Sequence, residues 1–221
     1  MRSKLLERIE VVYEDLDVIV IEKGSGVITY PVEGDRKGSA IQLIRKYWRV
    51  RGRENDHLYL LHRLDKETSG LLVFAKTSLA RESLRKQFER HAVVREYMAV
   101  TSGIPPKSKG VIQTFLGRNA RGKRGVSQIG KKAQTNFEVL QTNVRWNHSL
   151  IRCRLLTGRT HQARIHLAHL GTPIVGDHVY GKGTAPDLAL HACTLGFLHP
   201  RTGQPLLFTT SLPPRLQRLM E

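Results

Sequence analysis

The chain has 221 residues, of which 40% are apolar and 25% are charged, and this length can bury the core of one large or two small domains. No apolar run approaches the roughly 18 residues that a membrane-spanning helix needs, and the first residues lack the apolar segment of a signal peptide. We therefore expect a soluble globular protein in the cytoplasm, without a membrane partner.

The cysteine content gives no sign of two further classes of protein. Cys153 and Cys193 are the only cysteines, and they lie far apart without CxxC spacing. This pattern suggests neither a disulfide framework nor a thiolate metal site. Both cysteines are expected to be small core residues.

Charge is the most informative property of the composition. The chain has 36 Lys and Arg against 19 Asp and Glu, a net charge of +17 that attracts polyanions, most commonly nucleic acid. Between Glu96 and Asp177 the only acidic residue is Glu138. We expect residues 118–132 to form an exposed basic loop for RNA or DNA phosphates rather than a merely solvated loop, with the candidates Arg118, Arg121, Lys123, Arg124, Lys131 and Lys132.

The N-terminal half predicts buried strands alternating with amphipathic helices. Residues 11–23 alternate and then run apolar from Val18 to Ile21 after a turn at Glu14-Asp15, which predicts a buried strand, and residues 70–76 predict a second one. Ser39 is expected to cap a helix that ends near Val50, and a second helix begins at Thr77 or Ser78. Their inward faces are expected to carry Ile41, Ile44 and Trp48 in the first helix and Ala80, Leu84 and Phe88 in the second.

The C-terminal half is predominantly β. Strands are predicted over 95–101, 111–116, 134–140 and 150–156, then a helix ending at Gly171, and finally two strands and a short tail helix. No internal repeat or linker marks a boundary. We predict a single α+β domain, residues 1–221, built on a mixed, mainly antiparallel sheet.

Three residues at the edges of these elements form a candidate catalytic set. Asp65 lies among cations in LLHRLDKETSGLLVFAK, residues 60–76, where a carboxylate is either a structural ion pair or a catalytic group. An arginine within reach, such as Arg164, would keep this carboxylate charged by lowering its pKa. Tyr97 offers a flat face on which a base can stack. The residue pattern permits this grouping but does not assemble it.

Other chemistries find less support in the sequence. The histidines between His161 and His178 raise the possibility of a metal site, but only His166 and His169 have suitable helical spacing, and no HExxH motif or cysteine partner is present. No serine lies in a GxSxG elbow, and the cysteines lie in apolar strands. A metal-dependent hydrolase therefore remains only as an alternative.

Five segments together resemble one known family. HRLDKETSGLLVFAK, REYMAV and LLTGRTHQARIHLAHLGTPIVGDHVYG, with YEDLDVIVIEKGSGV before them and LHACTLGFLHPRTG after them, are similar to the motifs of the RluA-like RNA pseudouridine synthases. The resemblance implies a sheet with flanking helices around a catalytic cleft, and isomerisation of uridine to pseudouridine in ribosomal or transfer RNA. It implies that Asp65 is catalytic, Arg63 helps displace the target nucleotide, Tyr97 stacks on the uracil and Arg164 pairs with Asp65. No metal, nucleotide or organic cofactor is expected.

The chain departs from the family pattern at three places. Gly24 follows Lys23 where the family usually has proline, which is expected to loosen the turn, and Ala163 replaces a larger aliphatic residue before Arg164, which implies a roomier uracil pocket or one filled from elsewhere. Only residues 1–10 precede the first expected strand, so a short, monomeric form without the N-terminal RNA-binding domain is expected. A non-catalytic RNA-binding protein of the same fold remains the alternative.

Overall fold

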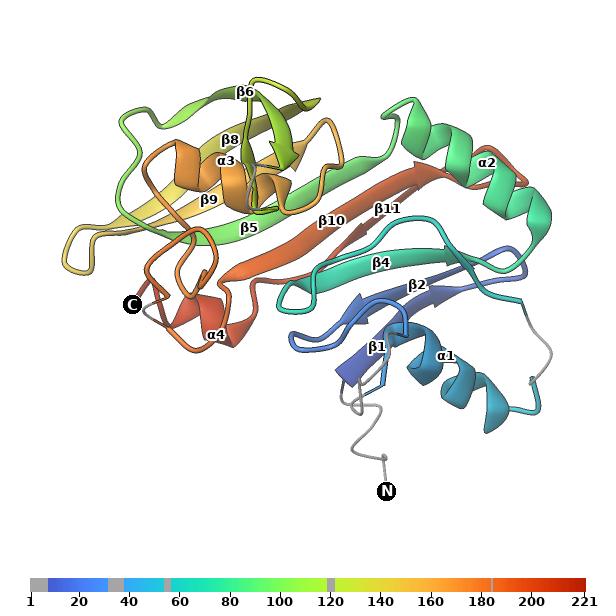
Figure 1. Ribbon diagram of the computed structural model, residues 1–221. Coiled ribbons are helices and arrows are strands. Elements are labelled where there is room, and N and C mark those ends of the chain that lie inside the picture. Colours follow the sequence, from blue (N-terminus) through green and yellow to red (C-terminus); the bar gives the residue numbers. More distant parts are fainter. Residues whose placement is uncertain (1–7, 32–37, 54–56, 119–121, 184) are drawn as a thin grey trace. The chain divides into compact units, whose positions relative to one another are not determined.

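The computed structural model describes residues 8–31, 38–53, 57–118, 122–183 and 185–221 and divides into two compact units (Figure 1). The first unit comprises Met1–Val93 and Thr194–Thr210, and the second comprises Val94–Cys193 and Ser211–Glu221. The chain therefore leaves the first unit after Val93, returns to it for Thr194–Thr210 and ends in the second unit. The single catalytic domain remains a prediction.

The first unit is built on antiparallel strand pairs. Its strands follow the order β1-β2-β4-β10, with β3 beside β4 and β11 beside β10. Its elements are β1 (Ile9–Glu14), β2 (Val18–Lys23), α1 (Ala40–Arg49), β3 (Tyr59–Leu60), β4 (Ser69–Ala75), α2 (Ser78–Glu89), the Thr194–Leu198 part of β10 (Leu190–Leu198) and β11 (Pro205–Thr209). The predicted strands and helices are confirmed here, except that the stretch 11–23 divides into β1 and β2, and the two-residue strand β3 was not predicted.

Burial on both faces explains the apolar runs of β2 and β4. All seven residues of β4 are buried, and on one face Val20 and Val73 pack with Leu84 of α2. A strand covered on both sides carries a continuous apolar run instead of an alternating one. In α1 the expected inward residue Ile41 is only half-buried. Leu43 takes the buried place, together with Ala40, Ile44 and Trp48.

Capping side chains start both helices where the sequence predicted. Ser39 accepts a hydrogen bond from the Gln42 amide at 3.3 Å, and the Gln42 side chain accepts one from the Ser39 amide at 2.8 Å. This reciprocal pair is a capping box. Thr77 caps α2 by accepting from the Ala80 amide at 3.2 Å.

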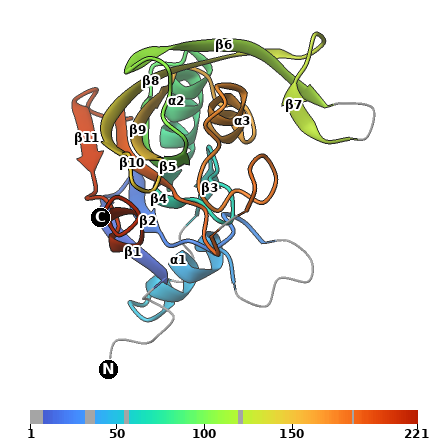
Figure 2. The same cartoon turned by 90° about the vertical axis from the view of Figure 1, so that its left-hand side faces the viewer.

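The second unit carries the longer antiparallel strands. Its order is β10-β5-β9-β8-β6-β7, to which β10 contributes residues 190–193. The elements are β5 (Val94–Ser102), β6 (Lys109–Arg118), β7 (Arg124–Val126), β8 (Lys131–Asn143), β9 (His148–Leu155), α3 (Gln162–His169) and α4 (Pro214–Gln217). Figure 2 shows β6 and β7 as a hairpin that extends past α3.

The basic segment 118–132 is more regular than predicted. Arg118 ends β6, and β7 pairs with β6 from Leu116↔Val126 to Arg118↔Arg124. Lys131 and Lys132 begin β8. The expectation of a loop was therefore wrong for these parts, because pairing with β6 extends residues whose composition alone favours a turn.

Two further expectations concern single features. Cys153 and Cys193 are free and buried, which confirms their expected place in the core. In the described part of the chain, none of the helices is both long and apolar enough to span a membrane.

Candidate active site

Asp65 lies in the segment that leads into β4, where it is partly buried. The preceding residue, Leu64, exchanges two hydrogen bonds with Thr29: the Thr29 hydroxyl donates to the Leu64 carbonyl at 2.9 Å, and the Leu64 amide donates to the hydroxyl at 3.2 Å. After Asp65, the Thr68 amide donates to the Asp65 carbonyl at 3.2 Å and closes a turn. The backbone on both sides of the carboxylate is thus held in place.

A buried lysine organises this loop from β2. Lys23 is completely buried, and its Nζ donates to the carbonyls of Gly24 at 3.0 Å, Val27 at 2.8 Å and Lys66 at 3.2 Å. The Gly26 amide and the Ser25 hydroxyl add bonds of 2.8 Å each to the carbonyls of Lys66 and Glu67. Because a buried ammonium needs its three donors satisfied, this arrangement fixes the turn and the Asp65 loop against each other.

Gly24 makes a contact that the family's usual proline could not make. Its amide donates to the Arg8 carbonyl at 2.9 Å, and a Cβ at this position would lie 3.1 Å from the same oxygen. Proline has no amide hydrogen to donate. The glycine at this departure from the family pattern therefore adds a backbone bond to the turn.

Arg63 is exposed beside the loop. Its Nη1 lies 3.4 Å from the Tyr30 hydroxyl, and its guanidinium carbon lies 5.9 Å from the centre of the Tyr30 ring. Both side chains are exposed, so this contact leaves the cation at the surface. An exposed arginine next to the candidate carboxylate suits contact with an anionic substrate.

In the second unit, Arg164 forms a buried ion pair with Asp177. The Arg164 Nε donates to one carboxylate oxygen at 2.8 Å and Nη2 donates to the other at 2.9 Å. The Val179 and Tyr180 amides each donate to Asp177 at 2.9 Å. Burial alone would raise the pKa of Asp177, but these bonds hold it below its ordinary value. Asp177 therefore stays ionised and orients the guanidinium.

Tyr180 also lies beside Arg164. Its ring centre lies 5.4 Å from the Arg164 guanidinium carbon, and its hydroxyl lies 2.9 Å from Nδ1 of His161. His161 precedes α3 with a φ of 57°, a left-handed conformation that is uncommon for a residue other than glycine. Such strain persists where neighbouring contacts enforce it, and it concentrates at functional sites.

The predicted site residues fall into both units. Asp65 and Arg63 belong to the first unit, and Tyr97 and Arg164 belong to the second. Tyr97 is partly buried in β5 opposite Cys153 of β9, and it packs against the core of its own unit. The pairing of Arg164 with Asp65 and the grouping of all four residues remain predictions.

Three supporting residues were missed at the sequence level: Lys23, Asp177 and Tyr180. Lys23 closes an apolar strand, a position where a buried lysine is unusual. Asp177 ends a long stretch with one acid and begins a turn, where an aspartate commonly accepts amide hydrogens two residues on. These signals were available, but they do not reveal the partner of either residue.

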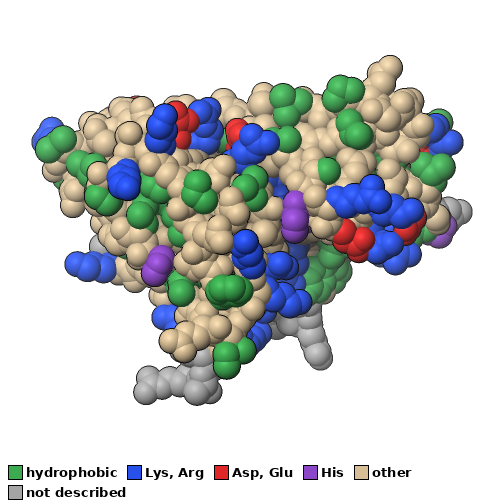
Figure 3. All heavy atoms as spheres, turned by 90° about the horizontal axis from the view of Figure 1, so that it is seen from above, with side chains coloured by type: hydrophobic (Ala, Val, Ile, Leu, Met, Phe, Trp, Pro, Cys, Tyr) green, Lys and Arg blue, Asp and Glu red, His purple; other side chains and the backbone are tan. Residues whose placement is uncertain are grey.

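The described basic candidates lie mainly on the surface. Arg118, Lys123, Lys131 and Lys132 are exposed, Arg124 is partly exposed, and Arg121 lies outside the described residues. Figure 3 shows several groups of Lys and Arg side chains on one face of the molecule, and among the described residues drawn there the group at its lower centre has no acidic side chain directly beside it. Exposed cations without acidic neighbours suit contact with a polyanion.

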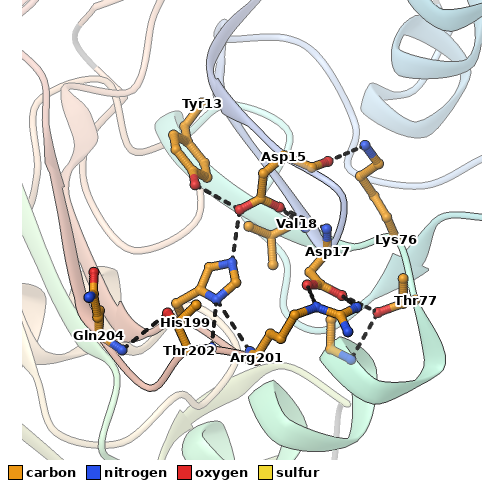
Figure 4. Close-up of polar contacts among 11 residues, drawn as sticks. Tyr13, Asp15, Asp17, Val18, Lys76, Thr77, His199, Arg201, Thr202 and Gln204 are labelled. Atoms are coloured by element: carbon orange, nitrogen blue, oxygen red, sulfur yellow. Dashed lines mark hydrogen bonds and ion pairs between the residues drawn. The ribbon is translucent and has the colours of Figure 1, made fainter.

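A second polar network lies at the opposite end of β2 and β4 from the Asp65 loop, because Lys23 pairs with Gly70 while Val18 pairs with Ala75. There His199 and the Tyr13 hydroxyl bond to Asp15 at 2.8 and 2.7 Å, and Arg201 binds Asp17 in a bidentate pair at 2.6 and 2.8 Å (Figure 4). These partners join the β1–β2 turn to the turn between β10 and β11. The charges pair with one another, so we interpret the network as scaffold.

The metal alternative finds no ligand set in the described part of the chain, where no three His, Cys, Asp or Glu residues are placed to hold an ion. His166 instead contacts the hydroxyls of Thr114 at 3.0 Å and Thr135 at 2.8 Å through its two ring nitrogens. Burial, and then the charge of His169, lower the pKa of His166 to about 4. It is therefore a neutral residue that joins α3 to β6 and β8.

Most of the chain matches the sequence model of one protein family. The model of the RNA pseudouridylate synthase family matches residues 17–169, which include Asp65, Tyr97 and Arg164. The chain belongs to the RNA pseudouridylate synthase family. The predicted resemblance to the RluA-like members is thus confirmed, and the chain is an RNA pseudouridine synthase, an isomerase.

Individual relatives support this synthase assignment. The RNA pseudouridine synthase YlyB of Bacillus subtilis is 37% identical over 96% of the chain and 72% of its own length. Ribosomal large subunit pseudouridine synthase D of Nitrosomonas europaea is 35% identical over 96% of the chain and 64% of its own length. The chain thus spans about two thirds of the length of these relatives.

Solved structures give the same fold. Human RNA pseudouridylate synthase domain containing 1 superposes with a TM-score of 0.81 at 25% identity, covering 99% of the chain and 90% of that structure. Human RNA pseudouridylate synthase domain containing 4 superposes with a TM-score of 0.79. The synthase therefore has the pseudouridine synthase fold, and the predicted α+β class with a mixed, mainly antiparallel sheet is confirmed.

Proposed function

We propose that the enzyme isomerises specific uridines in ribosomal or transfer RNA, with Asp65 as the catalytic residue. The observation that carries this proposal is the way the Asp65 loop is held: buried Lys23, Thr29 and the Lys23–Val27 turn fix the backbone around one carboxylate. A catalytic group must be held in a productive geometry before the substrate arrives. Ribosomal RNA is favoured by the name of the Nitrosomonas relative.

The reaction places a clear demand on this carboxylate. The bond between N1 of uracil and C1′ of ribose breaks, the base turns, C5 bonds to C1′, and the proton lost from C5 is balanced by one gained at N1. Whether the carboxylate attacks the base or the sugar or removes a ribose proton, it must be charged and close to the ribose. A cation that faces Asp65 would hold the charged carboxylate in position.

Arg164 is the cation that we assign to this task. Its pair with Asp177 uses Nε and Nη2, so Asp177 sets the plane of the guanidinium. A planar guanidinium has five N–H donors in a fixed fork and can serve two carboxylates at once. We propose that Arg164 also faces Asp65 and orients its carboxylate, while Tyr97 stacks on the uracil.

Arg63 is assigned to the displaced nucleotide. Extruding a base from a stem costs a few kcal/mol, which contacts made by the protein must offset. Exposed Arg63 beside the loop and the basic hairpin of the second unit would provide such contacts through phosphates. The location in the cytoplasm and the monomeric state remain predictions.

The test of Asp65 compares a pair of carboxamide variants in one loop. Asp65→Asn should reduce pseudouridine formation more than a hundredfold because an amide cannot supply the negative charge. Glu67→Gln, an exposed position two residues away, should retain activity. Pseudouridine is mapped in total RNA incubated with each protein. Equal modification by Asp65→Asn and wild type would reject the assignment.

The target uridine needs a separate experiment. Pseudouridines that disappear from ribosomal and transfer RNA in a deletion strain, and return on expression of the wild type but not of Asp65→Asn, would identify it. Unchanged maps in both RNA classes would reject the proposed substrates. RNA that is bound by the protein yet never modified would favour the non-catalytic alternative.

A further inference from the structure

The end of the β6–β7 hairpin combines basic side chains with exposed apolar ones. Phe115, Val126 and Ile129 have exposed fractions of 51%, 46% and 89%. No acidic residue occurs between Glu96 and Glu138 in the sequence, so these apolar side chains lie in a purely cationic segment. Exposed apolar groups are costly to hydrate, which makes a set of them in one charged region a candidate contact surface.

Two faces of β6 separate its buried and exposed residues. Leu116 points to the side of α3, where it is 8% exposed and packs with Ala133 and Ile165. Because successive side chains of a strand point to opposite faces, Phe115 and Gly117 lie on the other face. Lys132 lies directly opposite Phe115 in β8 and shares its face. An aromatic ring and a lysine are therefore adjacent on the open side.

A tight turn places Ile129 on this same face. The Ser127 amide donates to the Phe115 carbonyl at 2.9 Å, and the Ser127 hydroxyl donates to the Ile129 carbonyl at 2.7 Å. A Cβ on Gly117 would lie only 2.5 Å from the Ile129 carbonyl oxygen, so segment 127–130 rests directly on β6. A fixed backbone thus presents an isoleucine side chain almost entirely to solvent.

We propose that Phe115, Ile129 and Lys132 form a site for unpaired bases of the RNA substrate. Phe115 stacks on one base, Ile129 packs against its neighbour, and Lys132 binds the phosphate that connects them. Single-stranded recognition combines aromatic platforms with cations in this way, whereas paired bases in a duplex conceal their faces. The inference rests on the proposed function, since it requires RNA at the basic hairpin.

The experiment compares three double variants of the full chain. Phe115→Ser/Ile129→Ser removes the apolar contacts, and Lys131→Ala/Lys132→Ala removes charge. Leu16→Ser/Val50→Ser removes two apolar side chains of the first unit that are 82% and 68% exposed, as the matched control. Dissociation constants are measured by fluorescence anisotropy over a range of salt concentrations. The two probes are an RNA stem-loop with an unpaired loop and a fully paired RNA duplex.

The apolar variant should bind the stem-loop about tenfold more weakly, with an unchanged slope of log Kd against log salt and an unchanged affinity for the duplex. The charge variant should weaken binding of both RNAs and reduce the slope by roughly 1 to 2. The control should match wild type. Phe115→Leu keeps an apolar side chain at this position but lacks the aromatic face, so it should fold as wild type does. A partial loss of its stem-loop affinity would therefore come from the missing aromatic ring and not from misfolding.

The outcomes separate this inference from the proposed function. Wild-type stem-loop affinity in the apolar variant overturns the base site, and so does an equal loss on stem-loop and duplex. If the charge variant also binds as wild type does, the basic hairpin itself does not contact RNA, and that part of the proposed function fails. If the apolar variant alone is unchanged, only the base site is lost.

Discussion

The two units each contain a buried cation that is satisfied in a different way. In the first unit, the Lys23 ammonium donates to three backbone carbonyls and thereby holds the Asp65 loop. In the second unit, the planar guanidinium of Arg164 binds the carboxylate of Asp177 through two parallel bonds. An ammonium is a compact charge that gathers carbonyl dipoles, whereas a guanidinium is a fork that a carboxylate can orient. Lys23 therefore fixes the backbone of the loop around it, whereas Arg164 is itself oriented by Asp177.

The largest effect is expected from breaking the ion pair. Arg164→Leu strands the completely buried Asp177 and should reduce the free energy of unfolding by roughly 3 to 5 kcal/mol, with loss of activity. The sequence alone predicts that this variant leaves Asp65 without its cation. The structure shows that Asp177 also loses its partner. The measurement is chemical denaturation together with pseudouridine formation.

A second variant separates the two carboxylates. Arg164→Leu/Asp177→Leu removes both members of the buried pair and should recover much of the stability without activity. If the single variant is as stable as wild type, Asp177 is not stranded. If the double variant regains activity, Arg164 has no catalytic task.

Removing the ammonium should have a smaller effect on stability. Lys23→Met leaves three carbonyls without their donor and leaves the Arg164–Asp177 pair intact, so a loss of roughly 2 to 4 kcal/mol is expected. Activity should fall more than stability explains, because the Asp65 loop loses its anchor. Lys66→Met, at an exposed position in the same loop, is the control. A Lys23→Met enzyme with wild-type turnover at a temperature where it is fully folded would show that the anchor is not needed.

His166 is a third buried basic residue, but unlike Lys23 and Arg164 it is neutral. The folded-state pKa of His166 is about 4, below the ordinary value near 6.5, so the unfolded chain binds its proton first as the pH falls. Stability should therefore be fully present above about pH 6.5 and decline by roughly 1 to 3 kcal/mol toward pH 4. Buried His191, with its pKa also lowered to about 4, adds to the same decline.

His166→Gln isolates the contribution of one histidine. Glutamine can still contact Thr114 and Thr135 but does not titrate, so its unfolding free energy should depend less steeply on pH between 6.5 and 4. Denaturation series at several pH values measure the two slopes. Parallel slopes for wild type and variant would mean that the pKa of His166 does not differ between the folded and the unfolded enzyme.

The family, most of the strands and helices, and the main candidate Asp65 follow from the sequence because they depend on local signals. Apolar runs, the Ser39 and Thr77 caps and the contiguous HRLD and HQAR motifs act within a few residues of one another. The fully buried strand β4 is an example, since its apolar run is continuous in the sequence.

Only the tertiary structure decided which partners the buried charges have. Asp177 reaches Arg164 through a turn 13 residues away, and Lys23 reaches the Lys66 carbonyl because β2 and β4 pair in a given register. The exposure of Ile129 depends in the same way on a turn packed against Gly117. Residue types determine which contacts a chain can make, whereas register and turn geometry decide which of them it does make.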